Sequence, residues 1–129
     1  MSKYQNPAIY IDADRHRVRI FKSTLKQLGN PAYIQLLVNP SALCIAILPS
    51  ATTNKSLSHK VNFKSRSYEI TSKYFVKKLL ALYSPIEKSS KIKIEGHYSE
   101  TYNTAVFPLM NAVQISTEME GTANDRTCN

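Results

Sequence analysis

Residues 17–49 constrain the fold of this chain more than any other stretch, because their pattern changes twice within a short distance. Residues 17–20 read Arg-Val-Arg-Ile, with apolar side chains at every second position, which is the pattern of a β-strand. The residues that follow contain Ser23 and end in Leu-Gly, which predicts a short helix capped by the serine and ended by the glycine. Two apolar runs, 33–38 and 43–48, then flank the turn-forming sequence Asn-Pro-Ser and predict two paired strands.

A similar order recurs in the second part of the chain. Residues 69–71 predict a strand, Ser72 a second helix cap, and residues 73–83 the clearest helix, whose apolar positions form one continuous stripe. Residues 91–95 and 104–107 alternate in the strand pattern and predict a second hairpin.

We interpret this recurrence as an internal duplication. The sequence Ala-Ile-Leu-Pro that ends at Pro49 is matched by Ala-Val-Phe-Pro ending at Pro108. Chance similarity between short apolar strands is the alternative. The expected fold is a β-rich α+β protein in which two ββαββ-like halves form a small barrel. The expected segments are a loose leader, the first half of the barrel, a polar connector, the second half of the barrel and a disordered tail, at residues 1–7, 8–49, 50–59, 60–115 and 116–129.

Charge is distributed unevenly along the chain, whose formal net charge is +8. Between residues 15 and 94 the only acidic side chains are Glu69 and Glu87, and the other charged residues are Lys or Arg. A positive potential of this kind attracts polyanions, of which nucleic acid is the commonest in the cytoplasm. A lysine-covered surface without such a partner is the alternative. Because the sequence shows neither a membrane-spanning apolar run nor a secretion signal, we expect a cytoplasmic protein without membrane contact.

The most specific binding feature is the row Arg15, Arg17 and Arg19. On a strand the three side chains would point to one face, with no acidic residue between them in the sequence. Guanidinium groups bind phosphate groups and guanine edges through two hydrogen bonds at once, which predicts a DNA-binding surface. Tyr98 and Tyr102, near the tip of the second hairpin, are candidates for stacking on bases, with packing across the hairpin as the alternative. The predicted DNA-binding residues are Arg15, Arg17, Arg19, Lys22, Lys64 and Arg66.

The sequence Arg-Val-Arg-Ile-Phe-Lys-Ser-Thr-Leu-Lys-Gln-Leu-Gly at residues 17–29, with the hairpin after it, resembles the AbrB/SpoVT family of swapped-hairpin DNA-binding domains. Two such units in one chain are similar to the tandem arrangement of the MraZ group. Phe21 stands where the family typically has proline, and Ser23 where it has an acidic residue. The resemblance implies a barrel built from both halves, or interleaved dimers, in which basic residues of the first strand face DNA. The residues that it implies for this role are Arg15, Arg17, Arg19 and Lys22.

The sequence offers little support for catalysis. His16, His59 and His97 are scattered without the spacing of a metal-ligand pair. Cys44 lies in an apolar strand, where a thiol is normally inert and packs as a small hydrophobic side chain. The chain also lacks a glycine-rich phosphate-binding loop. We therefore expect no enzymatic activity, no cofactor and no bound metal.

The predicted function is binding of double-stranded DNA through a basic strand face, as a transcriptional regulator that forms a homodimer. Two alternatives remain open. One is a protein-interaction module, an accessory or antitoxin-like factor whose basic face docks on an acidic protein partner. The other is binding of single-stranded nucleic acid through the hairpin that carries Tyr98 and Tyr102.

Overall fold

The computed structural model describes residues 6–51, 58–61, 67–83 and 91–115 of the chain. In chain order their elements are β1 (Ala8–Asp12), β2 (Arg17–Phe21), α1 (Lys22–Gln27), β3 (Tyr33–Asn39), β4 (Cys44–Pro49), β5 (His59–Lys60), β6 (Ser67–Thr71), α2 (Lys73–Leu82), β7 (Lys91–Glu95), β8 (His97–Ser99), β9 (Thr104–Pro108), the 3-10 helix η2 (Leu109–Asn111) and β10 (Ala112–Gln114).

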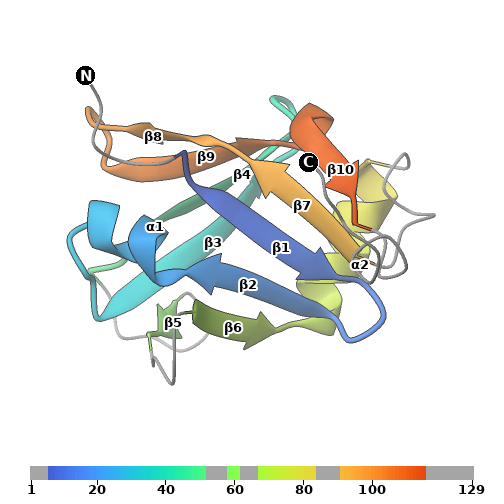
Figure 1. The fold of residues 1–129 in the computed structure, drawn as a ribbon, viewed down its shortest axis with the longest axis horizontal. Helices are drawn as coiled ribbons and strands as arrows, with labels where there is room; N and C mark the ends of the chain where they lie inside the picture. Colours follow the sequence, from blue (N-terminus) through green and yellow to red (C-terminus); the bar gives the residue numbers. More distant parts are fainter. Residues whose placement is uncertain (1–5, 52–57, 62–66, 84–90, 116–129) are drawn as a thin grey trace, which may run out of the picture.

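The strands form two antiparallel sheets of five strands each (Figure 1). We call the sheet with strand order β10-β7-β1-β2-β6 sheet A, and the sheet with order β5-β3-β4-β9-β8 sheet B. The β-rich α+β class predicted from the sequence is therefore confirmed. Among the residues that the structure describes, both sheets are open and end in two edge strands each, so the expected closed barrel does not form there.

The inner faces of both sheets pack into one hydrophobic core. Ile9 and Ile11 of sheet A and Ile45 and Ile47 of sheet B are almost completely buried in the same cluster. Each alternates with a less buried neighbour, because successive side chains of a strand point to opposite faces. Burying one such side chain contributes about 1.5–3 kcal/mol, so this shared core is what holds the two sheets together.

The helix α2 begins as predicted. The Ser72 hydroxyl oxygen accepts a hydrogen bond from the Phe75 backbone N–H at 3.1 Å, which satisfies one of the N–H groups that a helix start leaves without a partner. Phe75, Val76 and Leu79 form its buried stripe. Figure 1 shows α1 and α2 at opposite ends of the molecule. Neither of these helices is long and apolar enough to cross a membrane.

The start of α1 differs from the prediction, while its end agrees. The helix begins at Lys22, directly after the strand, so Phe21 occupies the cap position and provides no side-chain hydrogen bond. The predicted cap at Ser23 is wrong, because β2 leads into the helix without an intervening loop residue and Ser23 already lies in its first turn. At the other end Gly29 adopts a φ of 91° and its N–H donates to the carbonyl oxygen of Lys26, a helix end that glycine favours.

The second hairpin is formed by other strands than the sequence suggested. The predicted pairing of residues 91–95 with 104–107 is wrong: β7 pairs with β1 and β10 in sheet A, while β9 pairs with β8 and β4 in sheet B. Gly96 lies between β7 and β8, where the chain passes from one sheet to the other. A Cβ atom at Gly96 would collide with the carbonyl oxygen of Val106, so the crossing requires a residue without a side chain.

The predicted segment boundaries are covered only in part. Of the polar connector, residues 52–57 lie outside the described residues, and His59 belongs to β5, where it pairs with Ile34 of β3. Residues 1–5 of the predicted leader and the predicted disordered tail, 116–129, also lie outside the described residues. Pro7 of the leader accepts a hydrogen bond at its carbonyl oxygen from the Gly96 N–H at 2.8 Å.

Candidate functional site

The outer face of sheet A displays the arginines of β2. Val18 and Ile20 are fully buried, whereas the side chains of Arg17 and Arg19 are 46% and 50% exposed. The prediction that Arg17 and Arg19 share a solvent-facing surface is therefore confirmed. It follows from the alternation of a strand that has the core on one side only.

Glu69 from the neighbouring strand β6 binds both of these arginines. The Arg19 Nε and Nη2 atoms donate to Glu69 Oε2 at 2.9 and 2.7 Å, and Arg17 Nη1 lies 3.9 Å from Oε1. Glu69 is directly opposite Arg19 in the pairing of β2 with β6. No acidic residue lies between the arginines in the sequence, but sheet formation brings Glu69 beside them from a distant part of the chain.

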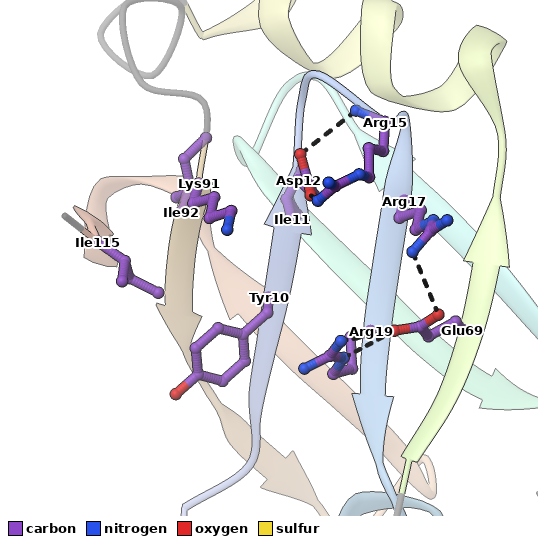
Figure 2. A pocket seen from close by; sticks show the side chains of 10 residues that line it. All are labelled: Tyr10, Ile11, Asp12, Arg15, Arg17, Arg19, Glu69, Lys91, Ile92 and Ile115. Carbon is purple, nitrogen blue, oxygen red and sulfur yellow. Dashed lines mark hydrogen bonds and ion pairs between the residues drawn. The ribbon is translucent and has the colours of Figure 1, made fainter. Parts of the chain in front are cut away.

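Arg15 is not part of the strand. It lies in the turn between β1 and β2, next to His16, which has a φ of 55°. Asp12 holds this turn: its carboxylate oxygens accept hydrogen bonds from the Arg15 backbone N–H at 3.3 Å and from Arg15 Nη1 at 3.2 Å. The prediction that Arg15 extends the strand alternation is wrong, although its guanidinium still lies at the same end of the sheet as Arg17 (Figure 2).

An aromatic pair lies beside the arginines on the same face. The rings of Tyr10 and Phe21 meet edge to face, with centroids 5.1 Å apart. Tyr10 is directly opposite Arg19 on one side and Lys93 on the other. The Lys93 Nζ atom lies 5.9 Å from the centre of the Tyr10 ring and 3.4 Å from Glu95 Oε2. A cross-strand row of Lys93, Tyr10, Arg19 and Glu69 thus spans the middle of sheet A.

A hollow of about 270 Å³ opens on this face, and Figure 2 shows the ten residues that line it. Its cationic groups come from the first turn, from β2 and from β7, and its acidic groups are Asp12 and Glu69. The four cationic side chains are those of Arg15, Arg17, Arg19 and Lys91. Four positive charges against two negative charges leave the hollow with a formal charge of +2, which favours an anionic ligand group.

A broader depression of about 760 Å³ lies on the other side of Tyr10. Phe21, Lys22 and Lys93 contribute to its lining, and Tyr10 is common to both cavities. The predicted residue Lys22 therefore lies on the same surface as the arginines. We call this surface the cationic face, formed by Tyr10, Arg15, Arg17, Arg19, Phe21, Lys22, Lys91 and Lys93.

Of the predicted stacking residues, Tyr98 lies in β8 of sheet B and Tyr102 in the turn between β8 and β9, and neither residue lines a cavity described above. The Tyr98 hydroxyl donates to Asn103 Oδ1 at 2.6 Å, and Asn103 Nδ2 donates to the carbonyl oxygen of Leu28 at 3.3 Å. Tyr98 thus packs across its hairpin, which is the alternative reading of the sequence. Tyr102 is 78% exposed at the hairpin turn. The two tyrosines are not brought together with the arginines.

Two of the predicted basic residues, Lys64 and Arg66, lie outside the described residues. The cationic face also contains four residues that the sequence analysis did not select: Tyr10, Phe21, Lys91 and Lys93. Local alternation was sufficient to place Tyr10 and the lysines on outer faces, since each alternates with buried isoleucines. The local pattern does not reveal that β7 pairs with β1, and this pairing places Lys93 beside Tyr10.

Outside the cationic face the described residues offer little reactive chemistry. Within these ranges no group of three His, Cys, Asp or Glu side chains is arranged to hold a metal ion. Cys44 is half-buried rather than fully buried, on the outer side of β4. Burial lowers the pKa of His59 below its usual value near 6.5 and raises that of Tyr68 above its usual value near 10.0.

Comparisons of the chain with protein-family models, with curated proteins and with solved structures found no match.

Proposed function

We propose that this protein binds single-stranded nucleic acid on the cationic face of sheet A. The observation that carries the proposal is the placement of Tyr10, which lies between Arg19 and Lys93 in the strand pairing and whose ring meets the ring of Phe21 edge to face. A nucleic-acid strand offers the complementary groups, flat bases that stack on aromatic rings and phosphates that bind guanidinium and ammonium groups. Each stacked base contributes about 1–3 kcal/mol, so two rings are enough to matter.

The shape of the surface favours a single strand over the major groove of a duplex. That groove is about 12 Å wide and admits a helix or a two-stranded ribbon. The five strands of sheet A, spaced about 4.8 Å apart, span about 19 Å. Because β2 is flanked by β1 and β6, the sheet face that carries Arg17 and Arg19 is wider than that groove. A flexible single strand can instead lie along the sheet and bring its bases down to the rings.

A second candidate is a duplex-binding regulator of the AbrB/SpoVT type, with two duplicated halves as in the MraZ group. The pairing registers favour a relation between the halves. Arg19 lies opposite Glu69, 50 residues further along, and β4, which contains Ala-Ile-Leu-Pro, pairs with β9, which contains Ala-Val-Phe-Pro. The strand β5 would be the counterpart of β1, and β7 the counterpart of β3. The pairing of β5 with β3 then corresponds to the pairing of β1 with β7. Equivalent strands that pair antiparallel are what a two-fold axis between duplicated halves would produce.

Under this second candidate function, the two halves form one swapped-hairpin unit, and the turn between β1 and β2 contacts duplex DNA. Arg15 projects from that turn with 62% of its side chain exposed, and Arg17 follows it at the start of β2. These two arginines reach phosphates of a duplex without entering its groove. Such contacts would give binding that depends weakly on base sequence.

The experiment is a fluorescence-anisotropy titration with labelled oligonucleotides of about 12 nucleotides, a length within the usual site size of single-strand binders. The same sequence is presented as RNA, as single-stranded DNA and as a DNA duplex, each at two salt concentrations. For the single strands we expect log K to fall with log salt with a slope of about −2 to −3, as three or four phosphates are neutralised. Tighter duplex binding would favour the second candidate instead.

A pair of double variants tests which surface binds. Arg17→Ala with Arg19→Ala removes two positive charges from the cationic face, and Lys73→Ala with Lys77→Ala removes two from the exposed side of α2. The first double variant should lose at least about tenfold in affinity, whereas the second should change it about twofold or less. Equal losses would mean that binding depends only on net charge, and no binding by the unmodified protein would overturn the proposal.

A further inference from the structure

Within the described strands, the charged side chains of sheet B are confined to the edge strand β5, which contributes Lys60. The strands β3, β4, β8 and β9 read YIQLLVN, CIAILP, HYS and TAVFP, without Asp, Glu, Lys or Arg. By contrast, four of the five strands of sheet A carry such residues. Because a typical surface is about 25–35% charged, four adjacent strands without any charged residue are unusual in so basic a protein. We call the outer surface of β3, β4, β8 and β9 the uncharged face.

The centre of the uncharged face is apolar. Ile45, Ile47 and Phe107 point into the core and are fully buried, so the residues between them on β4 and β9 point outward. The outward positions form cross-strand rows, since Leu37 is opposite Ala46 and Ala46 is opposite Val106. Leu37 is 45% exposed, one of the large apolar residues that the described part of the chain leaves open to solvent.

We propose that the uncharged face is the contact between two copies of this chain. Each copy has a formal net charge of +8, so any contact that brings basic surfaces together is opposed by repulsion. A two-fold contact places the same patch of both copies against each other, so the patch must be complementary to itself. An apolar surface meets this requirement, whereas the cationic face would repel its own copy. This contact also removes no charged group from water, which would be costly.

Sheet packing supplies the geometry for such a dimer. Two sheets pack face to face about 10 Å apart with their strands about 30° from parallel, which sets β4 and β9 of each copy at the centre. The four strands span about 14 Å across and about 20 Å along, a flat area near 300 Å². A stable interface buries about 800 Å² per partner, so the predicted dimer is weak and forms only at high protein concentration. If the proposed function holds, the two cationic faces of this dimer point away from each other.

Sedimentation equilibrium of the full chain, without nucleic acid, measures the association. We expect monomers at about 5 μM and a substantial fraction of dimers at about 500 μM, with association unchanged or stronger at high salt because salt screens the repulsion. Leu37→Asp should weaken association at least tenfold. Val113→Asp is the matched control: Val113 is 54% exposed on β10 of sheet A, so the same change there should leave association as it is. Circular dichroism verifies that both variants are folded.

Amide NMR spectra recorded over the same concentrations locate the contact. Shifts that move with concentration should map to Leu37, Ala46 and Val106 and spare Tyr10 and Arg19. A chain that stays monomeric at about 500 μM overturns the inference, as does a dimer whose shifts lie on sheet A or that dissociates as salt rises. Because the sample holds no nucleic acid, these outcomes are independent of whether the cationic face binds a strand.

Discussion

Replacing Glu69 by glutamine tests how the cationic face is controlled. Glu69 is bound by Arg19 at 2.7 Å and lies 3.9 Å from Arg17, so it neutralises part of the charge that a phosphate would use. Glutamine keeps the size of the side chain and removes its charge. Because this is a surface ion pair, with the Glu69 side chain 37% exposed, the loss of folding stability should be below about 1 kcal/mol.

The effect on binding can be worked out from the same geometry. A carboxylate about 6 Å from a bound phosphate repels it by about 0.7 kcal/mol in a water-like dielectric, before screening by salt. Its removal should tighten binding of a single strand about threefold at low salt, since about 1.4 kcal/mol corresponds to a factor of ten. The salt dependence should steepen by about 0.7 in slope if the released Arg19 gains one phosphate.

Fluorescence anisotropy with a labelled oligonucleotide at a series of salt concentrations measures both quantities. Glu100→Gln is the matched control, because Glu100 is an exposed acid in the turn between β8 and β9 and lines neither cavity of the cationic face. Unchanged or weaker binding by Glu69→Gln would refute the reasoning, since it would mean that the carboxylate does not compete with the ligand.

Four further changes have defined outcomes. Tyr10→Ala should weaken single-strand binding by about 1–3 kcal/mol in the anisotropy titration while Tyr10→Phe keeps it, and equal losses would exclude stacking. His59→Gln should flatten the acid side of the profile of folding stability against pH. Burial lowers the pKa of His59, so its contribution to stability is complete above about pH 6.5 and is lost as the pH falls through the lowered pKa. Urea midpoints that run parallel for both proteins from about pH 7 to 5 would contradict this. Gly96→Ala should lower the free energy of unfolding in urea by more than about 2 kcal/mol, because the new Cβ meets the backbone of Val106. Gly29→Ala, with open space around it but a φ of 91°, should lower it by about 1 kcal/mol. The reversed order would show that the clash at Gly96 is relieved. Ser72→Ala should cost about 1 kcal/mol through loss of the cap on α2, and the same change at Ser23, which caps nothing, should cost less.

Features that depend on neighbouring residues were predictable from the sequence. The alternation of Val18 and Ile20 determined which side of β2 is buried, and the apolar stripe of α2 determined which side of that helix packs on the core. The serine cap at Ser72 and the glycine end at Gly29 follow from backbone chemistry that acts within one turn. In each case the controlling interaction lies within a few residues, where the sequence pattern expresses it directly.

Features that depend on strand pairing were not predictable in the same way. The sequence gives no sign that β6 lies beside β2, so the capture of both arginines by Glu69 was unexpected. The pairing of β7 with β1, which creates the contact between Lys93 and Tyr10, was likewise hidden, because an alternating strand fits several neighbours equally well. The predicted cap at Ser23 was wrong for a related reason. The strand β2 continues directly into α1, so its last residue, Phe21, occupies the cap position.

The most direct test of the account is an NMR titration of the isotope-labelled chain with an unlabelled single-stranded oligonucleotide. If the cationic face binds the strand, the largest shift changes will occur at Tyr10, Arg19, Phe21 and Lys93, and the amides of β4 and β9 will move little. Shifts concentrated on sheet B, or an unchanged spectrum at saturating oligonucleotide, would contradict the account.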